Sequence, residues 1–92
     1  MNVHWTDLAV EHLADIHEYL SRTSPGYASR VIDRLTRRSE QIGTFSFSGR
    51  AIPEFNNPNI REILELSYRI VYCVRDDRID VLAVIHGSRD WP

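Results

Sequence analysis

The sequence predicts an α+β fold, in which a short N-terminal strand and an antiparallel helical hairpin pack on a sheet of three or four mostly antiparallel strands. Apolar residues recur at helical spacing in the first half of the chain, and three strand-like segments follow in the second half. A stretch rich in Gly, Ser, Pro and Asn separates the two halves. Helices followed by a run of strands are typical of an α+β arrangement.

The length of the chain sets the number of domains. With 92 residues, of which 42% are hydrophobic, residues 1–92 can form one domain with one modest core. No stretch approaches the roughly 20 apolar residues that span a bilayer, and the N-terminus lacks the basic and then apolar pattern of a secretory signal. We therefore expect a cytoplasmic protein with no membrane partner.

The net charge and the few cysteine and histidine residues argue against a nucleic acid-binding, disulfide-bonded or metal-binding protein. The formal net charge of -2 argues against bulk attraction to a nucleic acid backbone. Cys73 is the only cysteine, so no internal disulfide can form, and its apolar strand favours a buried thiol. His12 and His17 are five residues apart, whereas side chains on one helix face are three or four apart. We expect no metal and no cofactor.

The first helix is predicted after a short strand at Asn2–Trp5. Thr6 is a plausible N-cap. The apolar face of this helix consists of Ala9, Leu13, Ile16 and Leu20. An acidic stripe on another face consists of Asp7, Glu11, Asp15 and Glu18.

The second helix is predicted to begin at Ser24 and Pro25, as N-cap and first-turn residue, and to end at Gly43. Its apolar face consists of Ala28, Val31, Leu35 and Ile42, and its basic stripe of Arg30, Arg34 and Arg37. We interpret the acidic and basic stripes as solvated surfaces, because exposed ion pairs contribute only about 0 to 1 kcal/mol.

Residues 43–58 are predicted to form a loop that contains a short extended segment at residues 50–55. Phe45 and Phe47 alternate with serines in this loop. Two isolated aromatic residues without flanking basic residues are a weak nucleic acid signal. We therefore expect both rings to act as lids over the core.

Three strands are predicted at residues 60–66, 68–75 and 78–86, with Asp76 and Asp77 in a tight turn. Short connections favour antiparallel pairing of these strands. Residues 81–85 are apolar without alternation, which is typical of a central strand covered on both faces. Tyr72, which lies in mid-strand beside apolar neighbours, is predicted to be a core residue.

The order and spacing of several short segments resemble the RelE/ParE family of bacterial toxins, across nearly the whole chain. The segments are the two N-terminal helices, residues 49–54, Arg61-Glu62, the Tyr-Arg-Ile-Val-Tyr run at 68–72, and the Val-Ile-His-Gly-Ser-Arg run at 84–89. The resemblance implies a toxin of a type II toxin-antitoxin system, which arrests bacterial growth and is neutralised by a cognate antitoxin.

The C-terminal run from His86 to Asp90 resembles the ParE-type ending, in which a His-Gly pair is followed by Arg-Asp. The ParE branch of the superfamily inhibits DNA gyrase. This resemblance implies gyrase as the target, with target-binding residues Arg61, His86, Arg89 and Trp91.

An alternative follows from Pro53-Glu54, which resembles the Pro-Glu of YoeB-type enzymes, whose glutamate is a general base. RelE-like and YoeB-like branches cleave messenger RNA on the ribosome. Such cleavage needs a base for the 2′-hydroxyl, a cation for the phosphate and an acid for the leaving oxygen. The resemblance implies Glu54, Arg61 or Arg69, and His86 in those roles, although His86 falls about one residue away from the YoeB-type terminal histidine.

Two further interpretations remain open. The chain can be a family member that binds an antitoxin without being toxic. The candidate site residues also have structural interpretations: Glu54 pairs with Arg61 or Arg69, Arg69 anchors a carboxylate, and His86 is a packed histidine at a strand end.

Overall fold

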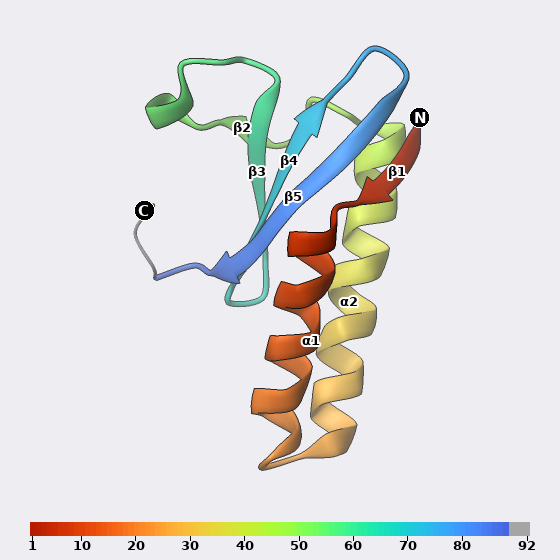
Figure 1. The fold of residues 1–92 in the computed structure, drawn as a ribbon, viewed down its shortest axis with the longest axis vertical. Coiled ribbons are helices and arrows are strands. Elements are labelled where there is room, and N and C mark those ends of the chain that lie inside the picture. The colour runs from red at the N-terminus through yellow and green to blue at the C-terminus, as the bar shows by residue number, and fades with distance from the viewer. Residues whose placement is uncertain (89–92) are drawn as a thin grey trace.

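The structure is a computed structural model that describes residues 1–88 of the chain. Two helices and five strands form a helical hairpin beside a twisted sheet (Figure 1). The elements in order are β1 (Asn2–Trp5), α1 (Asp7–Ser21), α2 (Pro25–Thr44), β2 (Arg50–Ala51), the 3-10 helix η1 (Pro53–Phe55), β3 (Ile60–Glu65), β4 (Tyr68–Val74) and β5 (Arg78–His86). The predicted α+β class is confirmed.

Both helices begin at the predicted caps. The Thr6 hydroxyl accepts a hydrogen bond from the backbone N–H of Ala9 at 3.3 Å and donates to the carbonyl of Val81 at 2.7 Å. The Ser24 hydroxyl accepts from the backbone N–H of Tyr27 at 3.3 Å. These bonds satisfy N–H groups that the first turn of a helix leaves without a partner.

Helix α2 ends at Thr44, one residue beyond the predicted end at Gly43. Gly43 is fully inside the helix, where an added Cβ would lie 2.6 Å from the carbonyl oxygen of Met1. The N-terminal ammonium donates to the Gly43 carbonyl at 2.9 Å. Gly43 therefore allows the N-terminus to approach α2 closely, and it does not stop the helix.

The sheet has five strands in the order β1-β5-β4-β3-β2, one more than the upper number predicted. β3, β4 and β5 pair antiparallel as predicted, whereas β1 pairs parallel to β5, with Val3 opposite Ile79. A β-bulge interrupts the pairing of β4 and β5, because Tyr72 is opposite Val81 but Val71 is opposite Ala83. At this bulge the Val81 carbonyl accepts hydrogen bonds from the hydroxyl and the backbone N–H of Thr6, the N-cap of α1.

The segment at residues 50–55 is extended only at β2, so its prediction as one extended segment was wrong for Pro53–Phe55. Pro53 occupies the first turn of η1, where its fixed backbone angle suits a helix. Asn56 ends the turn with a positive φ of 48°, a conformation that asparagine tolerates better than most residues.

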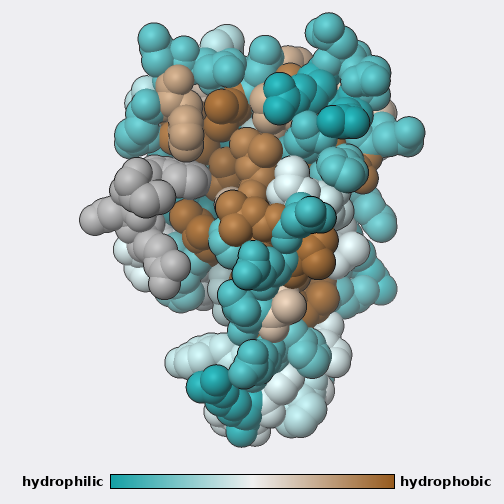
Figure 2. All heavy atoms as spheres, viewed as in Figure 1, coloured by the Kyte–Doolittle hydropathy of each residue, from teal (hydrophilic) through white to brown (hydrophobic). Residues whose placement is uncertain are grey.

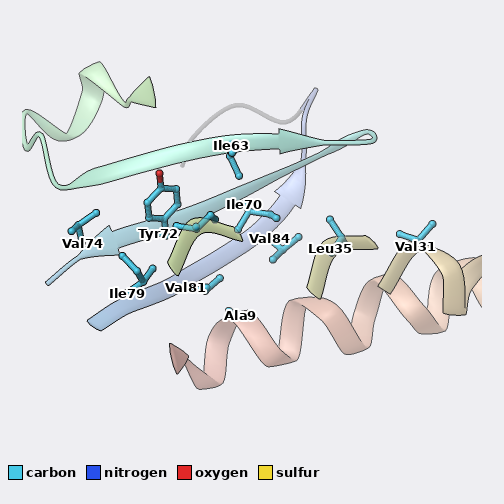
Figure 3. Packing of buried hydrophobic residues seen from close by; sticks show 11 residues of the cluster. Ala9, Val31, Leu35, Ile63, Ile70, Tyr72, Val74, Ile79, Val81 and Val84 are labelled. Carbon is cyan, nitrogen blue, oxygen red and sulfur yellow. The ribbon is translucent and has the colours of Figure 1, made fainter. Parts of the chain in front are cut away.

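The core lies between one face of the sheet and the helical hairpin (Figure 3). Ala9 of α1 and Leu35 of α2 meet Ile70, Tyr72 and other residues of the sheet. Tyr72 is completely buried, and Cys73 is buried on the other side of β4, so both predictions are confirmed.

The predicted lids are not lids. Phe45 and Phe47 are 67% and 57% exposed, so their prediction as core covers was wrong.

β5 is also not covered on both faces, because Ala83 and Ile85 are only half-buried. The helices pack on one face of the sheet and leave apolar side chains of β5 on the other face in contact with solvent.

The two charged stripes do not bind each other. Among residues 1–88, the ion pairs that involve a helix join neighbours within that helix, as in Arg22–Glu18 at 3.3 Å, or join α2 to β3, as in Arg34–Glu65 at 3.1 Å. Among the same residues, neither helix is both long enough and apolar enough to cross a membrane.

Candidate functional site

The candidate residues of the sheet lie on its two faces. The helix face carries the core residues Ile63 and Ile70, and alternation along the strands places Arg61, Tyr68 and His86 on that same face. The opposite face, here called the open face, carries Glu62 and Arg69 among others. The predicted site residues are therefore divided between two faces.

Arg61 holds the loop that precedes β2. Its guanidinium donates to the carbonyls of Pro58 at 2.9 Å and Gly49 at 2.7 Å. The guanidinium carbon also lies 4.8 Å from the centre of the Phe47 ring, within cation–π distance. These contacts explain why Phe47 stays outside the core, and they give Arg61 a structural role.

Tyr72 of β4 binds the same loop through its hydroxyl. Its hydroxyl accepts a hydrogen bond from the buried backbone N–H of Gly49 at 2.9 Å. An added Cβ at Gly49 would lie 2.5 Å from the Glu62 carbonyl and 2.7 Å from the Tyr72 hydroxyl. Only glycine fits at position 49, because the loop packs directly against Glu62 and Tyr72 there.

Arg69 belongs to an ion-pair network on the open face. Its NH1 atom lies 3.2 Å from both carboxylate oxygens of Glu62, and its Nε donates to the Gly87 carbonyl at 3.0 Å. Arg50 donates to the same Glu62 carboxylate at 2.8 Å. Glu62 is only 3% exposed, so two arginines satisfy one buried carboxylate. The interpretation of Arg69 as an anchor for a carboxylate fits this geometry, with Glu62 as that carboxylate.

His86 lies at the end of β5 with an exposed side chain. Its Nδ1 is 2.7 Å from the Ser88 hydroxyl, and the backbone N–H of Ser88 donates to the same atom at 3.3 Å. The imidazole packs edge-on against Tyr68, with ring centres 5.7 Å apart. Nδ1 is thus engaged by its own turn, and the other ring nitrogen forms no hydrogen bond with any of residues 1–88.

Glu54 lies in η1, outside the sheet. Its side chain is exposed and forms no ion pair with Arg61 or Arg69, which are engaged by backbone carbonyls and Glu62. The predicted structural pairing of Glu54 with either arginine is therefore not found.

The candidate acid, base and cation are not gathered into one centre. Arg61 is opposite Tyr72, whereas His86 is opposite Tyr68, four residues away along β4. At about 3.3 Å per residue and about 4.8 Å per strand, these positions are separated by roughly 16 Å. Arg69 lies on the other face of the sheet. Arg89 and Trp91, the remaining predicted target-binding residues, lie outside the described residues.

A second buried carboxylate lies at the far end of the open face. Asp80 accepts a hydrogen bond from Arg75 Nε at 3.0 Å, and Arg78 Nε lies 2.9 Å from its other oxygen. Burial alone would raise the pKa of Asp80, but the hydrogen bonds and charges of the two arginines outweigh burial and hold the pKa below its ordinary value. This cluster closes the β4–β5 turn, because Arg75 also donates its backbone N–H to the Arg78 carbonyl at 2.8 Å.

Besides its two charged clusters, the open face carries apolar side chains, which lie beside Arg69 and Glu62 in the register. The register places Leu64, Val71, Ala83 and Ile85 on it, and Leu64 is 63% exposed. Figure 2 shows a hydrophobic patch over the middle of the sheet. Contiguous exposed apolar surface of this kind marks interaction sites on small proteins.

The sequence analysis missed Glu62 and the open face. Glu62 follows Arg61 directly, and only the pairing of β2 with β3 brings Arg50 opposite it. The alternation of apolar and charged residues in β3, with Glu62 and Leu64 on one side and Ile63 on the other, was the signal that could have separated the two faces.

Comparison with known proteins agrees with this fold. A family model described as "ParE toxin of type II toxin-antitoxin system, parDE" matches residues 3–91. A solved structure described as "Chromosomal ParDE TA system from P. aeruginosa" is similar over 94% of this chain and 95% of that chain, with a TM-score of 0.76 and 18% sequence identity. No curated protein matches the sequence.

The helical hairpin on a mostly antiparallel sheet thus defines a toxin-like α+β domain of the RelE/ParE superfamily. Because the family model covers nearly the whole chain, the chain belongs to the ParE toxin family of type II toxin-antitoxin systems.

Proposed function

We propose that this protein is a cytoplasmic toxin that arrests bacterial growth by inhibiting DNA gyrase, and that a cognate antitoxin neutralises it. The observation that carries the proposal is the match of residues 3–91 to the ParE family, since the ParE branch acts on gyrase.

The arrangement of the site residues supports inhibition by binding over cleavage of RNA. A general base, a cation and a general acid act together only when they surround one reacting group. Here Glu54 is on η1, Arg69 is tied to Glu62 on the open face, and His86 is at the far end of the helix face. The net charge of -2 also gives little attraction to ribosomal RNA.

The open face supports a protein partner. Its apolar strip, made of Leu64, Val71, Ala83 and Ile85, surrounds Arg69 and Glu62. The ion pairs of Glu62 with Arg69 and Arg50 are already satisfied within the chain. A partner that covers the strip would remove apolar surface from water without having to break these pairs. We propose that a segment of the antitoxin covers this face.

The first test is the order in which synthesis fails in bacteria that express the chain without an antitoxin. Labelled thymidine and methionine report DNA and protein synthesis separately. We expect DNA synthesis to fall first and purified gyrase to lose supercoiling activity when the purified chain is added. An early fall in protein synthesis with intact supercoiling would contradict the proposal and favour the endoribonuclease.

A matched pair of variants sharpens this test. Glu54→Ala removes the candidate general base from an exposed position, and Glu40→Ala removes the same group from an exposed position on α2 with no proposed role. Inhibition of gyrase does not use the carboxylate, so we expect both variants to remain toxic. Loss of toxicity in Glu54→Ala alone would count against the gyrase proposal.

The antitoxin is tested separately by co-expression of the small protein encoded beside the toxin. We expect growth to be restored and the two chains to purify together. If the chain never arrests growth, yet binds that protein, it is the non-toxic family member instead.

A further inference from the structure

A surface cavity of about 610 Å³ lies between the helical hairpin and the adjoining ends of β4 and β5. Three tyrosines line it from three elements: Tyr19 of α1, Tyr27 of α2 and Tyr68 of β4. Asp15 and His86 also contribute to its wall. None of these residues except His86 has a role in the proposed inhibition of gyrase.

The three tyrosines are close enough to affect one another. Burial raises the pKa of Tyr68, and the neighbouring hydroxyls of Tyr27 and Tyr19 raise it further. The edge-on contact of His86 fixes the Tyr68 ring. The cavity therefore has aromatic walls from three directions.

Among residues 1–88, the charge of the acidic and basic side chains in this cavity is negative and unpaired. Asp15 is exposed and forms no ion pair with any of these residues, and none of their arginines lines the cavity. The Nδ1 atom of His12 is occupied as an acceptor for the backbone N–H of Val84, and that of His86 is engaged by Ser88. A cation that entered would find a carboxylate with no competing partner among residues 1–88.

The chain itself shows that one of these rings accepts a guanidinium. Arg30 lies over the Tyr27 ring, with its guanidinium carbon 5.9 Å from the ring centre. Arg30 does not line the tyrosine cavity, although Tyr27 borders both regions. Cation–π contacts of this kind favour arginine over lysine, because the planar guanidinium is weakly hydrated and stacks on aromatic faces.

We propose that this cavity binds the guanidinium of an arginine side chain presented by a protein partner, stacked among Tyr19, Tyr27 and Tyr68 and paired with Asp15. The inference deepens the proposed function and rests on it, since the antitoxin is the partner that would present the arginine. An apolar side chain would fit less well, because it would remove the Asp15 carboxylate from water without a partner.

The test uses the intact chain and two probes of nearly the same shape. Acetyl-arginine amide carries the guanidinium, and acetyl-citrulline amide replaces it with a neutral urea. We expect the arginine probe to shift the NMR signals of the Tyr19, Tyr27 and Tyr68 rings in a saturable way, with at least about fivefold tighter binding than the citrulline probe. Equal binding of the two probes, or no saturable shift at these rings, would overturn the proposal.

Two charge variants locate the site. Asp15→Asn should weaken binding of the arginine probe by about fivefold, as expected for the loss of one charge partner. Glu40→Gln removes the same charge from an exposed position on α2 outside the cavity, so it should leave binding unchanged. An equal effect of both variants would mean that general attraction, and not this cavity, binds the probe. Equal binding of acetyl-lysine amide with a free ammonium would overturn the assignment of arginine.

The antitoxin separates this inference from the proposed function. If the antitoxin neutralises wild type and Asp15→Asn with equal affinity, the arginine site is wrong while the toxin-antitoxin function stands. If the arginine probe binds as expected but no antitoxin restores growth, the proposed function fails while the cation site stands.

Discussion

The Nδ1 atom of His12 accepts a hydrogen bond from the backbone N–H of Val84 at 3.1 Å, which joins α1 to β5 across 72 positions of the sequence. Val84 follows the β-bulge that separates the pairs Tyr72–Val81 and Val71–Ala83. A buried backbone N–H without a partner destabilises the fold. His12 supplies the acceptor for the N–H of Val84.

Substitution of His12 tests this bond. His12→Leu leaves the Val84 N–H without its acceptor, and we expect a loss of about 1 to 3 kcal/mol in the free energy of unfolding. His12→Asn places an amide oxygen close to the position of Nδ1, so it should cost less. Urea unfolding measures both values, and equal losses would show that packing of the ring, and not the bond, matters.

Two glycines of α2 should respond in opposite directions to alanine. Gly26→Ala adds a Cβ whose nearest neighbour is 3.6 Å away, so better helix propensity should stabilise the protein by about 0.5 to 1 kcal/mol. Gly43→Ala places a Cβ 2.6 Å from the Met1 carbonyl oxygen, so β1 must move. We expect a lower melting temperature for Gly43→Ala and a higher one for Gly26→Ala. A gain in both variants would contradict the close packing of β1 on α2.

The network around Glu62 predicts unequal effects of its two arginines. The Arg69 side chain is 25% exposed and also binds the Gly87 carbonyl, whereas Arg50 is largely exposed. Arg69→Ala should destabilise the protein by about 1 to 3 kcal/mol, because it removes hydrogen bonds to a buried carboxylate. Arg50→Ala should cost about 0 to 1 kcal/mol, as exposed ion pairs do. Chemical denaturation distinguishes the two, and a larger cost for Arg50→Ala would refute this ranking.

Asp80 predicts a dependence of stability on acid. Its pKa is lower in the folded protein than in the unfolded chain, so its ion pairs stabilise the fold above about pH 4 and cease to do so as the pH falls through the folded-state pKa. Asp80→Asn should lose about 1 to 2 kcal/mol at pH 7, and the difference from wild type should shrink in acid.

A neighbouring aspartate provides the control for that measurement. Asp77→Asn removes the same charge from an exposed position of the same turn. Its unfolding free energy should follow the wild-type value across the pH range. A difference for Asp80→Asn that persists unchanged at low pH would show that its ion pairs are not the cause.

The parts of the fold that the sequence predicted depend on short-range chemistry. Thr6 and Ser24 cap N–H groups three residues away, so a reader of the sequence needs no knowledge of the rest of the chain. The role of Gly43 depends instead on Met1, which is distant in sequence, and the glycine was interpreted as a helix stop. The parallel pairing of β1 with β5 is of the same long-range kind.

The candidate site was harder to predict, because its residues depend on strand register. The endoribonuclease alternative and the structural interpretation each placed Arg61 or Arg69 beside Glu54. β3 and β4 direct these arginines to opposite faces, toward the Gly49 loop and toward Glu62. Phe47, which was interpreted as a lid over the core, instead forms a cation–π contact with Arg61 and is exposed. Side-chain direction on a strand changes with every residue, so small errors of register move whole sites.

The pairing of β1 with β5 has a consequence for synthesis on the ribosome. The helical hairpin consists of contacts near in sequence and can form while the chain is still growing. β1 has to wait, because the residues opposite Val3 and Trp5 are Ile79 and Val81, which emerge more than seventy positions later. The sheet is therefore completed only after translation has passed β5, so the emergence of β5, and not that of β1, decides when the sheet can be finished.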